Sequence, residues 1–249
     1  NLYSIKTIIY MKYIFSLLFV LSSITASNAQ LFTKEKVQNL QNIDKATLSW
    51  GYYLGFNNLD FKFDYNDDLG DIQTERTVGF NVGLIGNLRI NDHFDLRLEP
   101  GLVIAQRNLN YSINYFDNFE DEVSDSDLLR EVKSTYVYFP LLLKISTKRI
   151  NNIKPFILTG ISTAINLSSN EKNPDDNSAG EFRMKKSAQF YELGFGIDFY
   201  LDRFKFTPSI RGVFALNDEL IRDKDPNSPW TSNINKMQTR GIFVNFTVQ

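Results

Sequence analysis

The stretch LSWGYYLGFN, residues 48–57, alternates between large apolar side chains and small or polar ones. The large apolar set is Leu48, Trp50, Tyr52, Leu54 and Phe56, and the other set is Ser49, Gly51, Tyr53, Gly55 and Asn57. Successive side chains of a β-strand point to opposite faces, so a period of two predicts a strand with one apolar face.

The same alternation returns seven more times along the chain. It covers about residues 78–84, 94–107, 133–145, 155–166, 191–199, 204–214 and 242–248. Several of these runs reach the roughly 9 to 11 residues that a tilted strand needs to cross a bilayer. Strands of soluble proteins average only about 5 to 6 residues, so the runs favour strands that span a membrane.

The connections between the expected strands alternate in length. The long ones are 58–75, 112–131, 168–186 and 218–236, and the short ones are 91–93, 146–154 and 202–203. Outer-membrane barrels have short periplasmic turns and long external loops, and an even strand count returns both termini to the periplasm. The sequence therefore predicts an all-β fold, an eight-stranded antiparallel up-and-down transmembrane β-barrel in the outer membrane. The alternative is a soluble lipocalin-like barrel whose apolar side chains face inwards.

The non-apolar faces of these strands carry charges of both signs among Gly and Asn. Six of them form the predicted charge network of the barrel interior: Arg97, Glu99, Arg107, Glu192, Asp198 and Arg211. Eight strands enclose only enough room for side chains. We therefore expect a plugged lumen that conducts neither ions nor sugars.

The composition excludes several classes of function. The chain has no Cys, which excludes disulfides, thiolate metal sites and a lipid-modified N-terminal cysteine. Lys6 and Lys12 precede the expected cleavage point, so the mature chain carries 25 basic against 29 acidic side chains, or −4. No concentrated basic face is present to bind nucleic acid. We expect no cofactor, no small-molecule substrate and outer-membrane lipid as the surroundings.

The N-terminal region divides into three segments. Residues 11–29 have a positive start, an apolar run and the small residues Ser27 and Ala29, which is typical of a cleaved signal peptide. Residues 1–10 precede the apparent start methionine and are interpreted as an upstream artefact. Residues 30–46 are expected to be a short periplasmic lead-in segment, either docked or flexible, before a barrel over 47–249.

Candidates for chemistry are few. The only histidine, His93, lies in a tight turn, where the sequence predicts a solvated side chain and no catalytic role. Asp64, Asn66, Asp68 and Glu75 have the spacing of a calcium loop, but the glycine follows one residue late, which favours a plain external loop. Gly194 and Gly196 lie inside a strand and are expected to make room for interior side chains.

An acidic run with no basic residue lies in the second long connection. It is the candidate external docking loop, formed by Asp117, Glu120, Asp121, Glu122, Asp125 and Asp127. Its open alternatives are a solvated loop, a surface for a basic partner and a site for bridging cations. The aromatic residues just before it are expected to belong to the girdle at the membrane interface; they are Tyr111, Tyr115, Phe116 and Phe119.

Two segments carry a family resemblance. YVYFPLLLK at 136–144 and KPFILTG at 154–160 resemble the outer-membrane β-barrel domain common in Bacteroidetes. QNL at 38–40, GYYLGFNNLDF at 51–61, GFGIDFY at 194–200 and FKFTPSIR at 204–211 are similar to the PorT (SprT) family. The chain departs from the usual barrel ending, because it finishes Phe246-Thr247-Val248-Gln249 rather than on an aromatic residue.

That resemblance implies a barrel needed for type IX protein secretion and, in gliding members, for surface motility. It implies type IX secretion components as partners and no catalytic residues. The competing expectation is a general adhesin or envelope-stabilising barrel without a role in secretion.

Overall fold

The structure is a computed structural model and describes residues 37–117, 123–173, 177 and 182–249. The chain divides into two units, Asn1–Gln38 and Asn39–Gln249, and the barrel is the second unit. The predicted signal peptide, the start of the lead-in, and Phe119, Glu120, Asp121 and Glu122 lie outside the described residues.

The secondary structure of the second unit consists almost wholly of strands. They are β1 (Leu48–Tyr65), β2 (Gln73–Arg76), β3 (Val78–Arg89), β4 (Phe94–Leu98), β5 (Gly101–Asn110), β6 (Leu129–Ser146), β7 (Ile153–Asn166), β8 (Ser187–Tyr200), β9 (Lys205–Ala215) and β10 (Ile234–Val248). Two short 3-10 helices, η1 (Ile43–Lys45) and η2 (Ile113–Phe116), complete the described secondary structure. No described helix has the length and apolar character to cross a bilayer.

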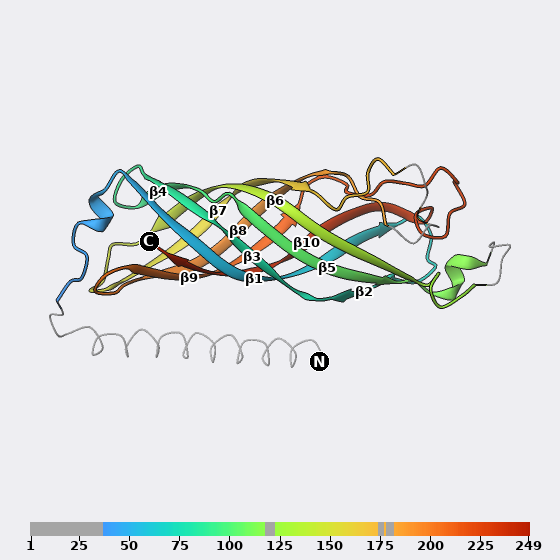
Figure 1. Cartoon of the computed structure of the whole chain (residues 1–249), viewed down its shortest axis with the longest axis horizontal. Helices are drawn as coiled ribbons and strands as arrows, with labels where there is room; N and C mark the ends of the chain where they lie inside the picture. Colours follow the sequence, from blue (N-terminus) through green and yellow to red (C-terminus); the bar gives the residue numbers. More distant parts are fainter. Residues whose placement is uncertain (1–36, 118–122, 174–176, 178–181) are drawn as a thin grey trace, which may run out of the picture. The chain divides into compact units, whose positions relative to one another are not determined.

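All strand pairs are antiparallel, and the sheet closes on itself because β1 pairs with both β10 and β3. The ten strands fill eight positions around the barrel. β4 and β5 both pair with β3 on one side and β6 on the other, so they are one wall position interrupted at Glu99 and Pro100. β2 and β3 likewise share one position, since both pair with β5. The predicted all-β antiparallel up-and-down barrel is confirmed (Figure 1).

The alternation of the sequence becomes the two faces of the wall. Leu48, Trp50, Tyr52, Leu54 and Phe56 are exposed on the outside of β1, with Trp50 69% exposed, whereas Tyr53 and Asn57 are buried inside. The same outward apolar rows occur on β3, β7, β8 and β10. The inside-out, lipocalin-like alternative is therefore wrong.

The connections separate by length at the two ends of the barrel. One end has the short turns 90–93, 147–152 and 201–204 and the end of β10, and we call it the turn end. The other has the connections 66–72, 111–128, 167–186 and 216–233, and we call it the loop end. The predicted first long loop, 58–75, is wrong in extent, because β1 continues to Tyr65 and β2 begins at Gln73.

β1 and β6 each have 18 residues. At about 3.3 Å per residue such a strand is about 60 Å long. At the tilt of about 45° that is usual for transmembrane strands it rises about 42 Å, which exceeds the hydrocarbon core of about 30 Å. The wall therefore extends beyond any membrane that its apolar band occupies.

Candidate functional site: the lumen and its two closed ends

The middle of the lumen holds a central ion cluster that joins opposite walls. Arg97 of β4 lies 2.9 Å from Glu99, and Arg211 of β9 lies 2.9 Å from Glu99 and 3.1 Å from Glu192 of β8. The Tyr138 hydroxyl donates to Glu192 Oε1 at 2.8 Å. All four charged side chains are buried. Charges held in such an interior are stable only when paired and hydrogen-bonded.

Glycines on the wall make room for these long side chains. A Cβ on Gly194 would lie 2.5 Å from Arg211 Cγ, and a Cβ on Gly196 would lie 2.4 Å from a ring carbon of Phe156. The two glycines therefore provide space inside the barrel, as their position within a strand indicates.

Nearer the turn end, a second buried pair joins β6 and β8. Lys144 Nζ lies 2.5 Å from Asp198 Oδ2, and the Thr207 hydroxyl donates to Asp198 Oδ1 at 2.8 Å. Lys144 also lies over the Phe156 ring, 4.2 Å from its centroid. The small polar pocket beside this pair has a volume of about 10 Å³, which is room for about one water molecule.

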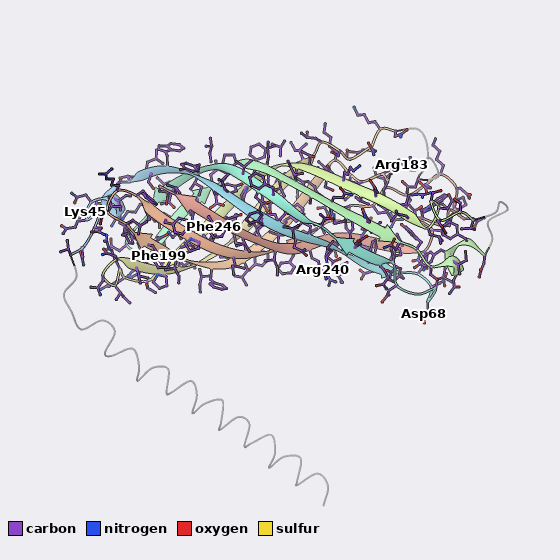
Figure 2. The ribbon with its side chains drawn as sticks, turned by 60° about the horizontal axis from the view of Figure 1, so that its bottom comes forward. Lys45, Asp68, Arg183, Phe199, Arg240 and Phe246 are labelled. Carbon is purple, nitrogen blue, oxygen red and sulfur yellow. The ribbon has the colours of Figure 1, made fainter. Side chains whose placement is uncertain are left out.

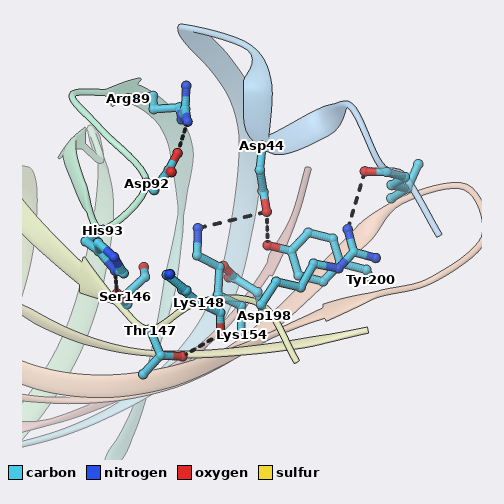
Figure 3. A network of polar contacts seen from close by, with 12 residues as sticks. Asp44, Arg89, Asp92, His93, Ser146, Thr147, Lys148, Lys154, Asp198 and Tyr200 are labelled. Atoms are coloured by element: carbon cyan, nitrogen blue, oxygen red, sulfur yellow. Dashed lines mark hydrogen bonds and ion pairs between the residues drawn. The ribbon is translucent and has the colours of Figure 1, made fainter. Parts of the chain in front are cut away.

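Residues 39–46 of the lead-in segment close the turn end (Figure 3). The Asn39 amide N–H donates to Asn152 Oδ1 at 2.9 Å, and Arg149 donates to the Asn39 carbonyl oxygen. Asp44 accepts from the Tyr200 hydroxyl at 2.5 Å and lies 3.9 Å from Lys154. Of the two alternatives for the lead-in, the docked one describes these residues.

His93 is also hydrogen-bonded at the turn end. Its Nδ1 lies 2.9 Å from the Ser146 carbonyl oxygen, and its own carbonyl accepts from the Ser146 amide at 2.7 Å (Figure 3). His93 lies in the predicted turn, but its side chain is half-buried rather than fully solvated, because its ring is hydrogen-bonded to the neighbouring strand end.

Arg107 does not join the central ion cluster with which the sequence grouped it. Its guanidinium donates to Thr239 Oγ1 at 2.9 Å and Ser134 Oγ at 2.6 Å, and lies 3.8 Å from the centroid of the Phe61 ring. Arg107 interacts electrostatically with Glu219, which accepts from the Thr239 amide and hydroxyl at 2.7 Å and 3.0 Å. Sequence analysis missed Glu219, because it lies in a long connection and follows no strand pattern.

The adjacent acids Asp218 and Glu219 in this connection have pKa values shifted in opposite directions. Burial raises the pKa of Glu219, and the Thr239 hydrogen bonds and Arg107 only reduce that rise. Burial also acts to raise the pKa of Asp218, but hydrogen bonds from the backbone of Met237 and Leu220 outweigh it and hold that pKa below its ordinary value.

The loop end is closed by a compact apolar cluster, which we call the plug. Its buried members are Phe61, Ile72, Leu109, Tyr111, Tyr115, Phe116, Val132, Phe182, Met184, Leu220, Trp230, Ile234 and Met237. Trp230 joins several parts of the plug. The centroid of its ring is 5.8 Å from that of Phe116, and its indole N–H donates to the Asp127 carbonyl at 3.0 Å. Arg130 covers the other side, 4.3 Å from the ring centroid.

Tyr111, Tyr115 and Phe116 thus face inwards and are 5%, 8% and 4% exposed. Their predicted place in an interfacial girdle is wrong, because all three side chains are buried in the plug. Burial raises the pKa of the Tyr115 phenol, whose hydroxyl donates to the Gly70 carbonyl at 2.7 Å.

The acidic loop is described only in part. Asp127 accepts from the Ser124 hydroxyl and amide at 2.7 Å and 3.0 Å, and these hydrogen bonds lower its pKa. Asp117 and Asp125 are described, and the three acids between them lie outside the described residues. In the calcium-like segment, Asp64 and Glu75 belong to β1 and β2 rather than to one loop, and no cluster of His, Asp and Glu suited to a metal ion occurs within the described ranges.

A protein-family model matches the larger part of the chain. Residues 28–220 match the model described as "Outer membrane protein beta-barrel domain". The chain belongs to this family. It is therefore an outer-membrane protein whose barrel is embedded in lipid.

Several solved barrels are similar to the chain. They are Neisserial surface protein A (10% identity, 82% of this chain, 99% of that chain, TM-score 0.39), the outer membrane protein OprG from Pseudomonas aeruginosa (15%, 82%, 95%, 0.43), and Ail, the attachment invasion locus protein of Yersinia pestis (13%, 80%, 95%, 0.36). No match was found among curated protein sequences.

Proposed function

We propose that this protein is a non-enzymatic outer-membrane barrel that acts by contact with other proteins and not as a pore. The observation that carries the proposal is the filled lumen: the lead-in segment and the Lys144–Asp198 pair close one end, the central ion cluster fills the middle, and the plug closes the other end. A barrel of eight wall positions leaves no further room for a solute path.

The contact serves type IX protein secretion and, in gliding cells, surface motility. This part of the proposal is supported by the similarity of residues 51–61 and 194–211 to the PorT (SprT) family. A barrel with a filled lumen cannot pass a folded substrate, so its role is to assemble or support a separate translocon.

The orientation belongs to the proposal as well. Both termini and the turn end face the periplasm, and the loop end is external, as in other barrels with short turns on one side. Cysteines introduced at Asp125 and Asn173 should react with an impermeant thiol reagent in intact cells. A cysteine at Asn152 should react only after the outer membrane is opened, and the reverse pattern would overturn the orientation.

An export assay tests the function. Deletion should leave type IX substrates in the periplasm while the outer membrane keeps its barrier to dyes and detergents. Complementation with versions lacking residues 31–45 or 117–127 then assigns the contact to the turn end or the loop end. Normal export in the deletion strain, with altered attachment or envelope strength, would instead support the adhesin or envelope-stabilising alternative.

A further inference from the structure

The barrel wall is split at one seam near the loop end. The β1–β3 ladder ends at the pair Asn58↔Val78. Beyond it, β1 continues to Tyr65 and pairs only with β10, while β2 pairs only with β5. The edges of β1 and β2 that face each other therefore have no ladder between them. At the same end β6 extends past β7 at residues 129–135 and β10 extends past β9 at residues 234–239. All other neighbouring strands in the described barrel are joined by a ladder.

A β-bulge explains why β2 leaves β1. Between the pairs Arg76↔Arg107 and Phe80↔Ile104 the β2–β3 wall advances four residues, from 76 to 80, while β5 advances three, from 107 to 104. The extra residue bends and twists the strand that contains it. β2 then follows β5 and diverges from β1, which follows β10.

The seam is open in space as well as in its pairing. A surface pocket of about 400 Å³ lies there. It is lined by Asp60, Phe61, Lys62, Phe63 and Tyr65 of β1, by Asp71, Ile72, Gln73, Thr74 and Arg76 before and within β2, and by Arg240 of β10. The Phe61 amide N–H is donated to Asp60 Oδ1 at 2.8 Å, so a side chain occupies a backbone donor of this strand. Asp60 is held in turn by Arg240 at 3.1 Å and by Arg76 at 3.9 Å.

The seam lies outside the apolar band. The outward side chains of β1 change from Trp50, Leu54 and Phe56 to Asp60 and Lys62. Figure 2 shows the same change along β10 and beyond, where Arg240 lies between Phe246 of the apolar band and Asp68 of the loop end. Lipid chains do not suit a pocket lined by Asp60, Lys62, Arg76 and Arg240 at this level.

We propose that this seam, β1 residues 59–65 against β2, binds an extended peptide segment of a partner protein by strand addition. Only an extended backbone presents donors and acceptors along its whole length to two strand edges at once. Alternate side chains of that segment would lie on Phe61 and Ile72 inside and beside Lys62, Arg76 and Arg240 outside. The charged residues that line the pocket are the basic Lys62, Arg76 and Arg240 and the acidic Asp60 and Asp71. This small basic excess favours acidic or neutral outward residues in the partner.

In the free protein, Asp60 occupies the hydrogen-bonding position that the incoming strand would take. A carbonyl of the incoming strand would accept the Phe61 N–H in place of Asp60 Oδ1, and Arg76 would release Asp60 as the seam widens. This inference rests on the proposed contact role, and it identifies the seam as the surface through which the contact is made.

The first test uses the purified full-length barrel in detergent micelles and the probe peptide Glu-(Thr-Val)4-Glu. Amide hydrogen exchange is followed in residues 59–65 and 73–77, with β8 and β9 as internal references because both are paired on both sides. The peptide should slow exchange at the seam by about tenfold or more and leave the references unchanged. The matched control peptide carries N-methyl groups on alternate amides, which removes backbone donors and keeps the side chains. No protection at millimolar peptide, or equal protection by both peptides, would overturn the proposal.

The second test substitutes Asp60, whose side chain accepts the Phe61 N–H. Asp60→Ala frees the Phe61 N–H and removes the 3.9 Å ion pair with Arg76 across the seam, so it should tighten peptide binding several-fold. The matched variant Glu131→Ala removes an acid from an exposed pair with Lys133 on β6, away from the seam, and should leave binding unchanged. Weaker binding in Asp60→Ala than in Glu131→Ala would count against the scheme.

The two proposals fail separately. If the deletion strain exports normally but the peptide protects the seam, the secretion role is wrong and the docking surface stands. If export fails in the deletion strain while the seam binds no extended peptide, the contact role stands and this surface is wrong.

Discussion

The two halves of the lumen have the same wall and opposite contents. The half toward the turn end contains the paired charges, with Arg211 between Glu99 and Glu192 and Lys144 on Asp198. A small apolar cluster of Leu142, Phe156 and Leu158 lies beside them. The half toward the loop end is filled by the plug, an apolar core like that of a soluble protein. The difference follows from what lies outside the wall at each level.

Single strands show how the change is made. On β1, Trp50 and Phe56 point outwards and Asn57 inwards, but farther along Phe61 points inwards and Lys62 outwards. On β10, Phe246 is outside and Asn245 inside, whereas Arg240 is outside and Met237 inside. In lipid the outer face must be apolar, so polar groups go inside. Beyond the bilayer the outer face meets water, and the hydrophobic effect again places apolar groups inside.

The largest expected effect lies in the ion-paired half. Arg211→Met removes the shared cation of Glu99 and Glu192 and leaves both carboxylates buried. Breaking a buried pair costs about 3 to 5 kcal/mol. Urea unfolding of the barrel in lipid vesicles should show this loss. Arg240→Met, whose pair with Asp60 is exposed, should cost less than about 1 kcal/mol. Equal losses in the two variants would show that the lumen is wet and that its charges are screened.

A second variant measures the plug. Trp230→Ala removes the ring that Phe116 and Arg130 contact, a truncation expected to cost about 3 kcal/mol. The loss should be local to the loop end, because the paired strands hold the rest of the barrel. Limited proteolysis should cut the 216–233 connection faster while the unfolding midpoint of the barrel changes little. Trp50→Ala, on the lipid side, is the control and should not affect this cleavage. A cooperative loss of the whole barrel would show that the two halves fold as one unit.

A third variant lies where the two halves meet. Thr239→Val removes the hydroxyl that joins Arg107 to Glu219. Leaving buried polar groups without this partner should cost about 1 to 2 kcal/mol. The same substitution at Thr163, on the outer face of β7, should have little effect in the same unfolding experiment. A neutral Thr239→Val would mean that water replaces the hydroxyl.

The sequence predicts the part of the fold that lies in the membrane and mispredicts the part above it. Residues 48–57 and 242–248 keep one alternation through the bilayer, so their strands and faces follow from period two. The pattern inverts after Asn58, and the sequence then suggests a loop at 58–75 where β1 continues to Tyr65. Local pattern cannot distinguish a strand that changes surroundings from a strand that ends.

For the candidate site, the sequence predicts which side chains face inwards but not which of them meet. Arg97, Glu99, Glu192 and Arg211 face inwards by alternation alone, but which acid meets which base depends on shear around the barrel. Arg107 shares their face and lies too near the loop end to reach them. The plug collects Tyr111, Phe182 and Trp230 from three connections, and no local signal relates residues so far apart in sequence.

The smallest effect concerns pH and separates two adjacent acids of the loop end. The pKa of Glu219 is raised by burial above its ordinary value of 4.5, so the folded state holds this proton more tightly than the unfolded state. Its contribution is therefore most favourable below pH 4.5 and is lost as the pH rises through the folded pKa. Asp218 has a lowered pKa, and its contribution is present above its ordinary value of 3.8 and lost as the pH falls further. Resistance of the 216–233 connection to protease should thus increase as the pH falls from neutrality toward 4.5 and decrease as it falls below 3.8. Glu219→Gln should abolish the increase and Asp218→Asn the decrease. Each variant is compared with the unaltered protein at the same pH, so that the contributions of the other titrating acids to the profile cancel. If Glu219→Gln leaves the upper part of the profile unchanged, Arg107 neutralises this carboxylate fully and the boundary between the two halves is ionic rather than apolar.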